Sequence, residues 1–261
     1  MDFAGSIPAI YDRYLGQLLF RPYADDLVAR LAAERPGRAL ELAAGTGIVT
    51  AQAAKALPGA HIVATDLSQA MLDVAAGRKE TSGVTFQVAD AQDLPFDDGS
   101  FDAVLCQFGV MFLPDKARAY GETRRVLRPG GTLLFSVWEG IDDNPIAATV
   151  QAALAGYFPE DPPQFISRIP HGYHDPSAIR EALCTAHFNE IDVTALTLPS
   201  VSPSAGDVAI GFCQGTPIRN EIVSRGGDLE AVTDAVRSAL TGTFGHGEVR
   251  ADMAALVVTA R

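Results

Sequence analysis

The segment Leu40–Glu41–Leu42–Ala43–Ala44–Gly45–Thr46–Gly47 decides the fold. Its apolar start predicts a buried strand over Ala39–Ala43, and the alanine-rich stretch Ile48–Ala56 predicts a helix. Small residues and two glycines, two positions apart, join the strand to the helix. This order brings backbone close to a nucleotide cofactor, because glycine has no side chain to block the approach. An ordinary strand-to-helix turn is the alternative interpretation.

The residues after Gly45 and Gly47 separate the cofactor classes. A dinucleotide fingerprint, G-x-G-x-x-G, needs a third small residue where this chain has Thr50. A phosphate loop needs a lysine after its last glycine, where this chain has Ile48. Neither phosphate signature is complete, so a cofactor without a phosphate at this turn is favoured over a dinucleotide.

Composition sets the class of protein and of partner. The 261 residues suit one domain, or one domain with a large insertion, and the 48% hydrophobic content is enough for a full core. The net charge of −12 opposes a general affinity for nucleic acid, so a small molecule is the expected substrate. No apolar run is long enough for a membrane span, and Met1–Ala4 lacks the pattern of a signal peptide. Cys106, Cys184 and Cys213 are scattered, which predicts a cytoplasmic protein without a zinc knuckle.

Predicted strands and helices alternate from Leu40 to Phe135, which indicates a parallel sheet with helices on both faces. After the first strand, the predicted strands are His61–Thr65, Val84–Val88, Ala103–Cys106 and Thr132–Val137. The predicted helices between them are Gln69–Arg78, capped by Ser68, and Lys116–Val126, ended by Arg128–Gly131. Beyond Trp138 we expect helices near Ile146–Tyr157, Ser177–Ala186, Ala205–Gln214 and Leu229–Leu240, and strands over Ile191–Thr197 and Val249–Thr259.

Acidic residues stand at the ends of two of these strands, and open parallel sheets bind ligands at the carboxyl ends of their strands. Asp66 can accept both hydrogen bonds of a ribose diol, and Leu67 and Met71 can cover the faces of a purine. Asp90 can accept from an adenine amino group, while the Ala91 backbone donates to a ring nitrogen. The alternatives are a helix cap for Asp66, a turn cap for Asp90, and core packing for the two apolar residues.

Four ordered motifs resemble those of the class I S-adenosylmethionine-dependent methyltransferases. The family's first motif, acidic-x-G-x-G-x-G, is matched by Glu41-x-Ala43-x-Gly45-x-Gly47, with alanine in place of the first glycine. The other three are Asp90 with Leu94–Pro95–Phe96, then Phe101–Gly109, then Arg125–Leu133. The set covers about residues 39–137 and is most similar to the subgroup with ubiquinone and menaquinone biosynthesis C-methyltransferases.

The resemblance implies a doubly wound, mostly parallel, Rossmann-like α/β sheet of seven strands, the last of them antiparallel. It implies methyl transfer from S-adenosylmethionine to a small, partly apolar molecule, with O-, N- and C-acceptors all open. The alternatives are a nucleotide-dependent oxidoreductase and a non-catalytic S-adenosylmethionine-binding module. The expected cofactor-binding residues are Arg13, Glu41, Ala43, Gly45, Gly47, Asp66, Leu67, Met71, Asp90, Ala91, Gln107 and Phe108.

The resemblance implies that the turn over Ala43–Gly47 lies behind the methionine part and the ribose of the cofactor, and that Glu41 orients the turn. Gln107 and Phe108 are expected beside the sulfonium, where a ring face is favourable for a cation. Arg13 is expected to pair with the methionine carboxylate. Packing in the core or lid is the alternative for Phe108, and a solvated helix position is the alternative for Arg13.

The remaining segments are expected to form a mostly helical lid on the methyltransferase domain. They are an N-terminal cap over residues 1–35 and, within a domain over residues 36–261, insertions at about 141–174 and 200–247. His171, Tyr173 and His174 are candidate catalytic residues, because histidine transfers protons near neutral pH. A plain loop role is the alternative for them. His171 and His174 lack a third ligand nearby, so no metal is expected.

Overall fold

The structure is a computed structural model that describes residues 7–261 and divides into two compact units. The first unit holds Met1–Pro22, described from residue 7 on, with Glu139–Gly172 and Thr197–Ala254. The second unit holds Tyr23–Trp138, Tyr173–Leu196 and Ala255–Arg261. The expected cap over residues 1–35 is thus divided after Pro22, and its residues 1–6 lie outside the described residues.

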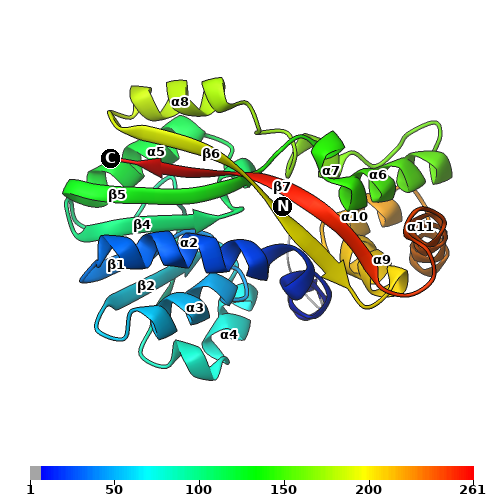
Figure 1. Cartoon of the computed structure of the whole chain (residues 1–261), viewed down its shortest axis with the longest axis horizontal. Coiled ribbons are helices and arrows are strands. Elements are labelled where there is room, and N and C mark those ends of the chain that lie inside the picture. The colour runs from blue at the N-terminus through cyan, green and yellow to red at the C-terminus, as the bar shows by residue number, and fades with distance from the viewer. Residues whose placement is uncertain (1–6) are drawn as a thin grey trace. The chain divides into compact units, whose positions relative to one another are not determined.

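The sheet has seven strands in the order β3-β2-β1-β4-β5-β7-β6 (Figure 1). Their bounds are β1 Arg38–Glu41, β2 His61–Asp66, β3 Thr85–Val88, β4 Phe101–Gln107, β5 Leu127–Trp138, β6 Ile191–Ser202 and β7 Val249–Ala260. The first five strands pair in parallel, and β7 runs antiparallel to β5. The predicted sheet with an antiparallel last strand is confirmed. The parallel order places the carboxyl ends of β1, β2, β3 and β4 at one edge.

Helices cover both faces of the sheet in the second unit. Its helical elements are α2 Arg21–Glu34, α3 Ile48–Ala56, α4 Gln69–Ala76, η2 Lys79–Thr81, η3 Val110–Phe112, α5 Lys116–Val126 and α8 Pro176–Thr185. On one face, Leu27 and Leu31 of α2 and Val49 of α3 pack in one buried cluster with Leu105 and Leu134 of the sheet. On the other face, the ring of Tyr120 in α5 lies 5.8 Å from that of Phe135 in β5. Burial of these apolar side chains is the main stabilisation of the sheet.

The first unit is helical apart from the ends of β6 and β7. Its described helical elements are α1 Ile7–Ile10, the π-helix η1 Tyr11–Phe20, η4 Ile141–Asp143, α6 Pro145–Tyr157, α7 Phe165–Arg168, α9 Ala205–Gly215, α10 Ile218–Ser224 and α11 Leu229–Phe244. Close packing joins η1 to α9, because a Cβ atom at Gly211 would lie 2.6 Å from Leu15 Cδ2. Within residues 7–261, no helix is long and apolar enough to cross a membrane.

Several features of the chain differ from the sequence prediction, including β6, which continues to Ser202 instead of ending at Thr197. Strand β5 begins at Leu127 rather than Thr132, because Leu127 pairs with Phe101 before a register shift in the ladder. The short helices α7 and α10 were not predicted, since they lie among the prolines and glycines that interrupt any periodic pattern.

Replacing Gly47 by alanine should destabilise the fold. Its φ is +79°, and an added Cβ would lie 2.7 Å from Ala75 Cβ and 3.0 Å from Ala75 Cα in α4. Left-handed strain and overpacking together should lower the free energy of unfolding by about 2–3 kcal/mol, measured by urea denaturation. Gly59→Ala is the matched control, since a Cβ there meets nothing within 4 Å. Equal stability of the two variants would contradict this account of Gly47.

Candidate functional site at the carboxyl ends of the strands

The turn that follows β1 is left-handed at three alternate positions. The φ angles are +51° at Ala43, +55° at Gly45 and +79° at Gly47. Ala43 therefore adopts the left-handed backbone conformation that favours glycine. Ala43 is exposed, and a Cβ atom added to Gly45 would meet nothing within 4 Å. The turn thus leaves open space against its backbone, which fits a ligand lying on it.

The carboxylate of Asp66 joins this turn to the end of β2. Its Oδ2 accepts a hydrogen bond from the Gly45 backbone N–H at 2.9 Å, and its Oδ1 accepts from the Ser68 N–H at 2.8 Å. A carboxylate has about four lone-pair positions, so both oxygens can still accept bonds from a ligand. Burial raises the pKa of Asp66, and the backbone N–H donors oppose that rise. The Ser68 hydroxyl accepts from the Met71 N–H, which confirms the predicted helix cap.

Glu41 ends β1 beneath the turn and is 2% exposed. Its Oε2 accepts a hydrogen bond from the Thr50 hydroxyl at 2.6 Å, and the Thr65 hydroxyl donates to its backbone oxygen at 2.8 Å. Burial raises the pKa of Glu41 to about 8, against the hydrogen bond from Thr50, which lowers it. Glu41 therefore supports the turn from inside, next to the carboxylate of Asp66.

The ends of β2 and β3 offer contrasting groups. Leu67 is 65% exposed, which is unusual for a large apolar side chain beside a strand end, whereas Met71 is buried. The Oδ1 of Asp90 accepts from the Gln92 backbone N–H at 2.9 Å, so the turn that sequence reasoning kept as an alternative is present. The Gln92 amide also donates to both Asp90 oxygens, at 3.1 and 3.3 Å. Ala91, next to Asp90, is 8% exposed.

An aromatic cluster stands where β4 and β5 end. Phe108 follows Gln107 with a φ of +50°, and its N–H donates to the Ser136 backbone oxygen at 2.9 Å. The rings of Phe108 and Trp138 stack with centroids 3.7 Å apart, and Tyr23 packs edge-on against both. The core packing kept as an alternative for Phe108 is therefore observed.

The loop after β4 is in direct contact with the glycine turn. A Cβ atom at Gly109 would lie 2.5 Å from Ala43 Cβ and 2.6 Å from Cys106 Sγ, so glycine alone fits this position. The ends of β1, β2 and β4 thus form one continuous surface.

Residues 40–135 match the protein family described as "Methyltransferase domain". The chain contains a class I methyltransferase domain. It is 47% identical over 120 residues to the demethylmenaquinone methyltransferase of Clavibacter sepedonicus, which covers 45% of this chain and 46% of that protein. It is 43% identical over 119 residues to the enzyme of the same name from Thermus thermophilus, which covers 45% and 53%. The chain spans about half the length of the curated relatives that it matches.

Solved structures of low sequence identity share the fold. The YcgJ protein of Bacillus subtilis has a TM-score of 0.58 at 19% identity, covering 90% of this chain and 97% of that one. A phosphoethanolamine N-methyltransferase of Haemonchus contortus, solved with S-adenosyl-L-methionine, has a TM-score of 0.58 at 19% identity and covers 97% and 56%. S-adenosylmethionine is the methyl donor of class I methyltransferases.

The second unit holds every predicted cofactor-binding residue except Arg13. Arg13 belongs to the first unit, where its guanidinium carbon lies 5.1 Å from the centre of the Tyr14 ring. The candidate catalytic residues are divided between the units. His171, in the first, is buried with Nδ1 2.7 Å from the Glu139 backbone oxygen. Tyr173 and His174 belong to the second.

Sequence reasoning missed three residues of this site, Thr50, Gly109 and Trp138. Thr50 was noted only as a missing glycine, although a hydroxyl in the first helical turn can reach a carboxylate on the preceding strand. Trp138 is the single tryptophan and ends the fifth strand. Its place at a strand end was the sequence signal that could have assigned it to the site. Within residues 7–261, no three histidine, cysteine, aspartate or glutamate side chains are grouped as a metal site.

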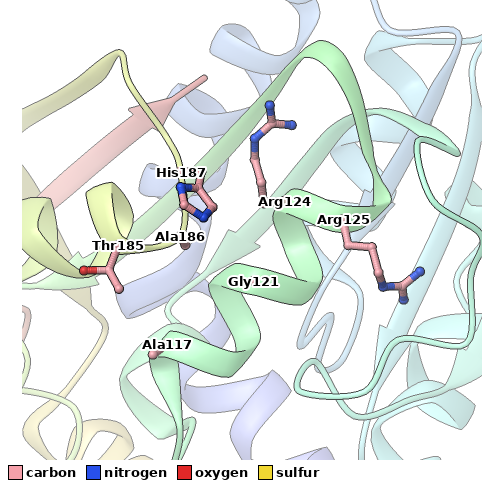
Figure 2. Close-up of a pocket in the computed structure, with 7 residues that line it drawn as sticks. All are labelled: Ala117, Gly121, Arg124, Arg125, Thr185, Ala186 and His187. Atoms are coloured by element: carbon pink, nitrogen blue, oxygen red, sulfur yellow. The ribbon is translucent and has the colours of Figure 1, made fainter.

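A cavity of about 530 Å³ lies elsewhere on the second unit, between α5 and the end of α8 (Figure 2). It is lined by Ala117, Gly121, Arg124, Arg125, Thr185, Ala186 and His187. Figure 2 shows Arg125 pointing away from His187, and its guanidinium bonds Glu122 and Asp98 instead. None of these residues is at the carboxyl end of a strand, so the cavity is separate from the candidate site.

The buried Glu41 predicts a pH-dependent effect on stability. Folding raises its pKa from 4.5 to about 8, so the folded state holds the proton more tightly than the unfolded chain. Its contribution to stability is therefore fully present below the ordinary glutamate pKa and is lost as the pH rises through about 8. Glu41→Gln removes this titration and keeps an oxygen for Thr50.

The melting temperature of Glu41→Gln should therefore rise relative to that of the parent between about pH 5 and about pH 9. Thermal unfolding at several pH values measures the difference. The exposed Glu80, changed to Gln, is the control and should follow the parent at every pH. Parallel curves for Glu41→Gln and the parent would show that Glu41 does not titrate in this range.

Proposed function

We propose that this protein transfers a methyl group from S-adenosylmethionine to a small, partly apolar molecule. The observation that carries the proposal is the open, left-handed turn, with Gly45 held by Asp66 and Glu41 buried beneath it. A turn of this kind accepts the ribose and methionine parts of a cofactor, neither of which carries a phosphate, against its backbone. Two of the curated relatives that match this chain are named as methyltransferases, which supports the proposal.

Each strand end has a proposed role toward the cofactor. Asp66 would accept from the ribose hydroxyls with the lone pairs that Gly45 and Ser68 leave available. The exposed Leu67 would cover one face of the adenine, and Asp90 with the Ala91 N–H would bind its edge. Gln107 would lie beside the methionine part. When bound, the cofactor supplies an electrophilic methyl group on a sulfonium.

The chain's charge suits this cofactor better than a dinucleotide. Glu41, Asp66 and Asp90 stand at or just past the ends of three neighbouring strands. Glu41 is buried and holds its proton near neutral pH, so the carboxyl groups of Asp66 and Asp90 are the ones that attract a cation such as a sulfonium or an ammonium and repel a pyrophosphate. Thr50 occupies the place of the third dinucleotide glycine, is fully buried, and is bonded to Glu41. The oxidoreductase alternative is disfavoured for these reasons.

Several expectations stay predictions. They are the cofactor contact of Arg13, proton transfer by His171 or His174, the role of the first unit as a lid, and a cytoplasmic location. Methyl transfer itself distinguishes an enzyme from a non-catalytic binding module. Much of its rate can come from positioning the acceptor in line with the sulfur–methyl bond and from excluding water.

Calorimetric titration tests the cofactor assignment. The parent protein should bind S-adenosylhomocysteine with a Kd on the micromolar scale, about −8 kcal/mol, and should not bind NADH. Gly45→Ala should weaken S-adenosylhomocysteine at least about ten-fold, because its Cβ would occupy the space against the turn. That variant should still fold, with a left-handed penalty of about 1–2 kcal/mol.

Gly59→Ala again serves as the control and should bind as the parent does. Binding of NADH instead of S-adenosylhomocysteine by the parent would overturn the proposal. Unchanged affinity in Gly45→Ala would show that the turn is not the floor of the cofactor site.

A further inference from the structure

A lysine and two tyrosines form a cluster beside the loop that follows β4. Lys116 begins α5, Tyr120 lies one turn further along it, and Tyr173 precedes α8. All three belong to the second unit. The Lys116 Nζ donates to the backbone oxygens of Leu113 at 3.0 Å and Met111 at 3.4 Å, and it lies 4.8 Å from the centre of the Tyr173 ring.

The lysine ammonium thus lies close to two backbone carbonyls and one ring face. A cation over an aromatic ring attracts it, more strongly when the lysine is withdrawn from water. Lys116 is half-buried, and burial lowers its pKa. Lys116 therefore holds Tyr173 against the loop over residues 109–113.

That loop is in contact with the candidate cofactor site. Gly109 abuts Ala43 of the glycine turn, and Met111 and Leu113, whose carbonyls hold Lys116, follow a few residues later. A chain of contacts therefore leads from the turn through Gly109 and Lys116 to Tyr173. Tyr173 is thus connected to the loop that begins just after Gln107, the last residue of β4.

The second tyrosine fixes the direction of the Tyr173 hydroxyl. The oxygens of Tyr120 and Tyr173 are 3.3 Å apart, and Tyr120 is 2% exposed. A buried hydroxyl needs a partner for its proton, and within residues 7–261 the Tyr173 oxygen is the one recorded for Tyr120. When Tyr120 donates, Tyr173 accepts, and the proton of the half-buried Tyr173 is left to donate outward.

Burial raises the pKa of both phenols, so each keeps its proton at neutral pH. Tyr173 is then a hydrogen-bond donor rather than a base. A donor fixed in direction recognises an oxygen lone pair, and it rejects an apolar group at the same place because the donor would be left unpaired.

We propose that the Tyr173 hydroxyl donates a hydrogen bond to an oxygen atom of the methyl acceptor, with Lys116 and Tyr120 as positioning residues. The acceptor class is a compound that carries a phenolic, enolic or carbonyl oxygen. This inference rests on the proposed function, since it concerns the acceptor of the same reaction.

The test compares two probes that differ by one oxygen, 1-naphthol and naphthalene, titrated by calorimetry into the protein saturated with S-adenosylhomocysteine. The parent should bind 1-naphthol about five- to ten-fold more tightly than naphthalene, the range of one hydrogen bond. Tyr173→Phe keeps the ring over Lys116 and removes the hydroxyl, so it should abolish this difference. Its affinity for S-adenosylhomocysteine and for naphthalene should not change.

Two further variants separate positioning from general structure. Lys116→Met should reduce the preference for 1-naphthol, and Lys116→Arg should restore most of it. The two variants should have equal melting temperatures. Tyr157→Phe changes a 41% exposed tyrosine of the first unit and is the matched control, expected to behave as the parent.

Equal or undetectable binding of the two probes by the parent would overturn the inference, and so would an unchanged preference in Tyr173→Phe. Failure of the proposed function has a different signature, since the parent would then not bind S-adenosylhomocysteine in the first titration.

Discussion

The carboxylate of Asp66 holds together the two turns on which the candidate site is built. Its oxygens accept from Gly45 after β1 and from Ser68 after β2. Hydrogen bonds from backbone N–H groups to a charged carboxylate are stronger than neutral ones, and here both donors are fixed by their strands. Without this acceptor, the Gly45 N–H would lose its partner, and the turn would keep its backbone bond from Ala44 to Thr65 and the bond from the Thr65 hydroxyl to Glu41 as ties to β2.

The other parts of the site depend on the position of that turn. Gly109 fits against Ala43 only because it has no side chain, so the position of the loop after β4 depends on the position of the turn. Lys116 then bonds two carbonyls of this loop and attracts Tyr173. Contacts of a few ångströms thus connect the proposed cofactor floor to the proposed acceptor-binding hydroxyl, within one unit of the chain. The cost is strain, since Ala43 and Phe108 both adopt positive φ angles.

Local sequence signals predicted the sheet well because each of them acts within a few residues. The helix predicted near Lys116–Val126 is α5, because Pro129 and Gly130 follow its end as expected, and the structure adds an Asp115 cap at its start. The ends of β2 at Asp66 and β4 at Gln107 lie within one residue of their predicted positions, since an apolar run stops at each. The start of β5 was missed because its pairing with Phe101 is a tertiary effect that overrides the Pro–Gly–Gly signal.

The sequence predicted the types of residue in the candidate site better than their contacts. The glycine spacing and the strand-end carboxylates were visible in the sequence. The two hydrogen bonds that Asp66 accepts from backbone N–H groups, and the hydrogen bond from the Thr50 hydroxyl to Glu41, were not. The Phe108–Trp138 stack and the Tyr120–Tyr173 pair, the latter 53 positions apart, have no local signature. Their contacts arise from the way α5, β5 and the segment before α8 pack together.

A crystal structure of the complex with S-adenosylhomocysteine tests the central claim most directly. The account predicts both ribose hydroxyls within hydrogen-bond distance of the Asp66 carboxylate, the ribose and homocysteine backbone against Gly45, and the sulfur beside Gln107. A ligand bound elsewhere, with no atom in contact with Asp66 or the glycine turn, would contradict it.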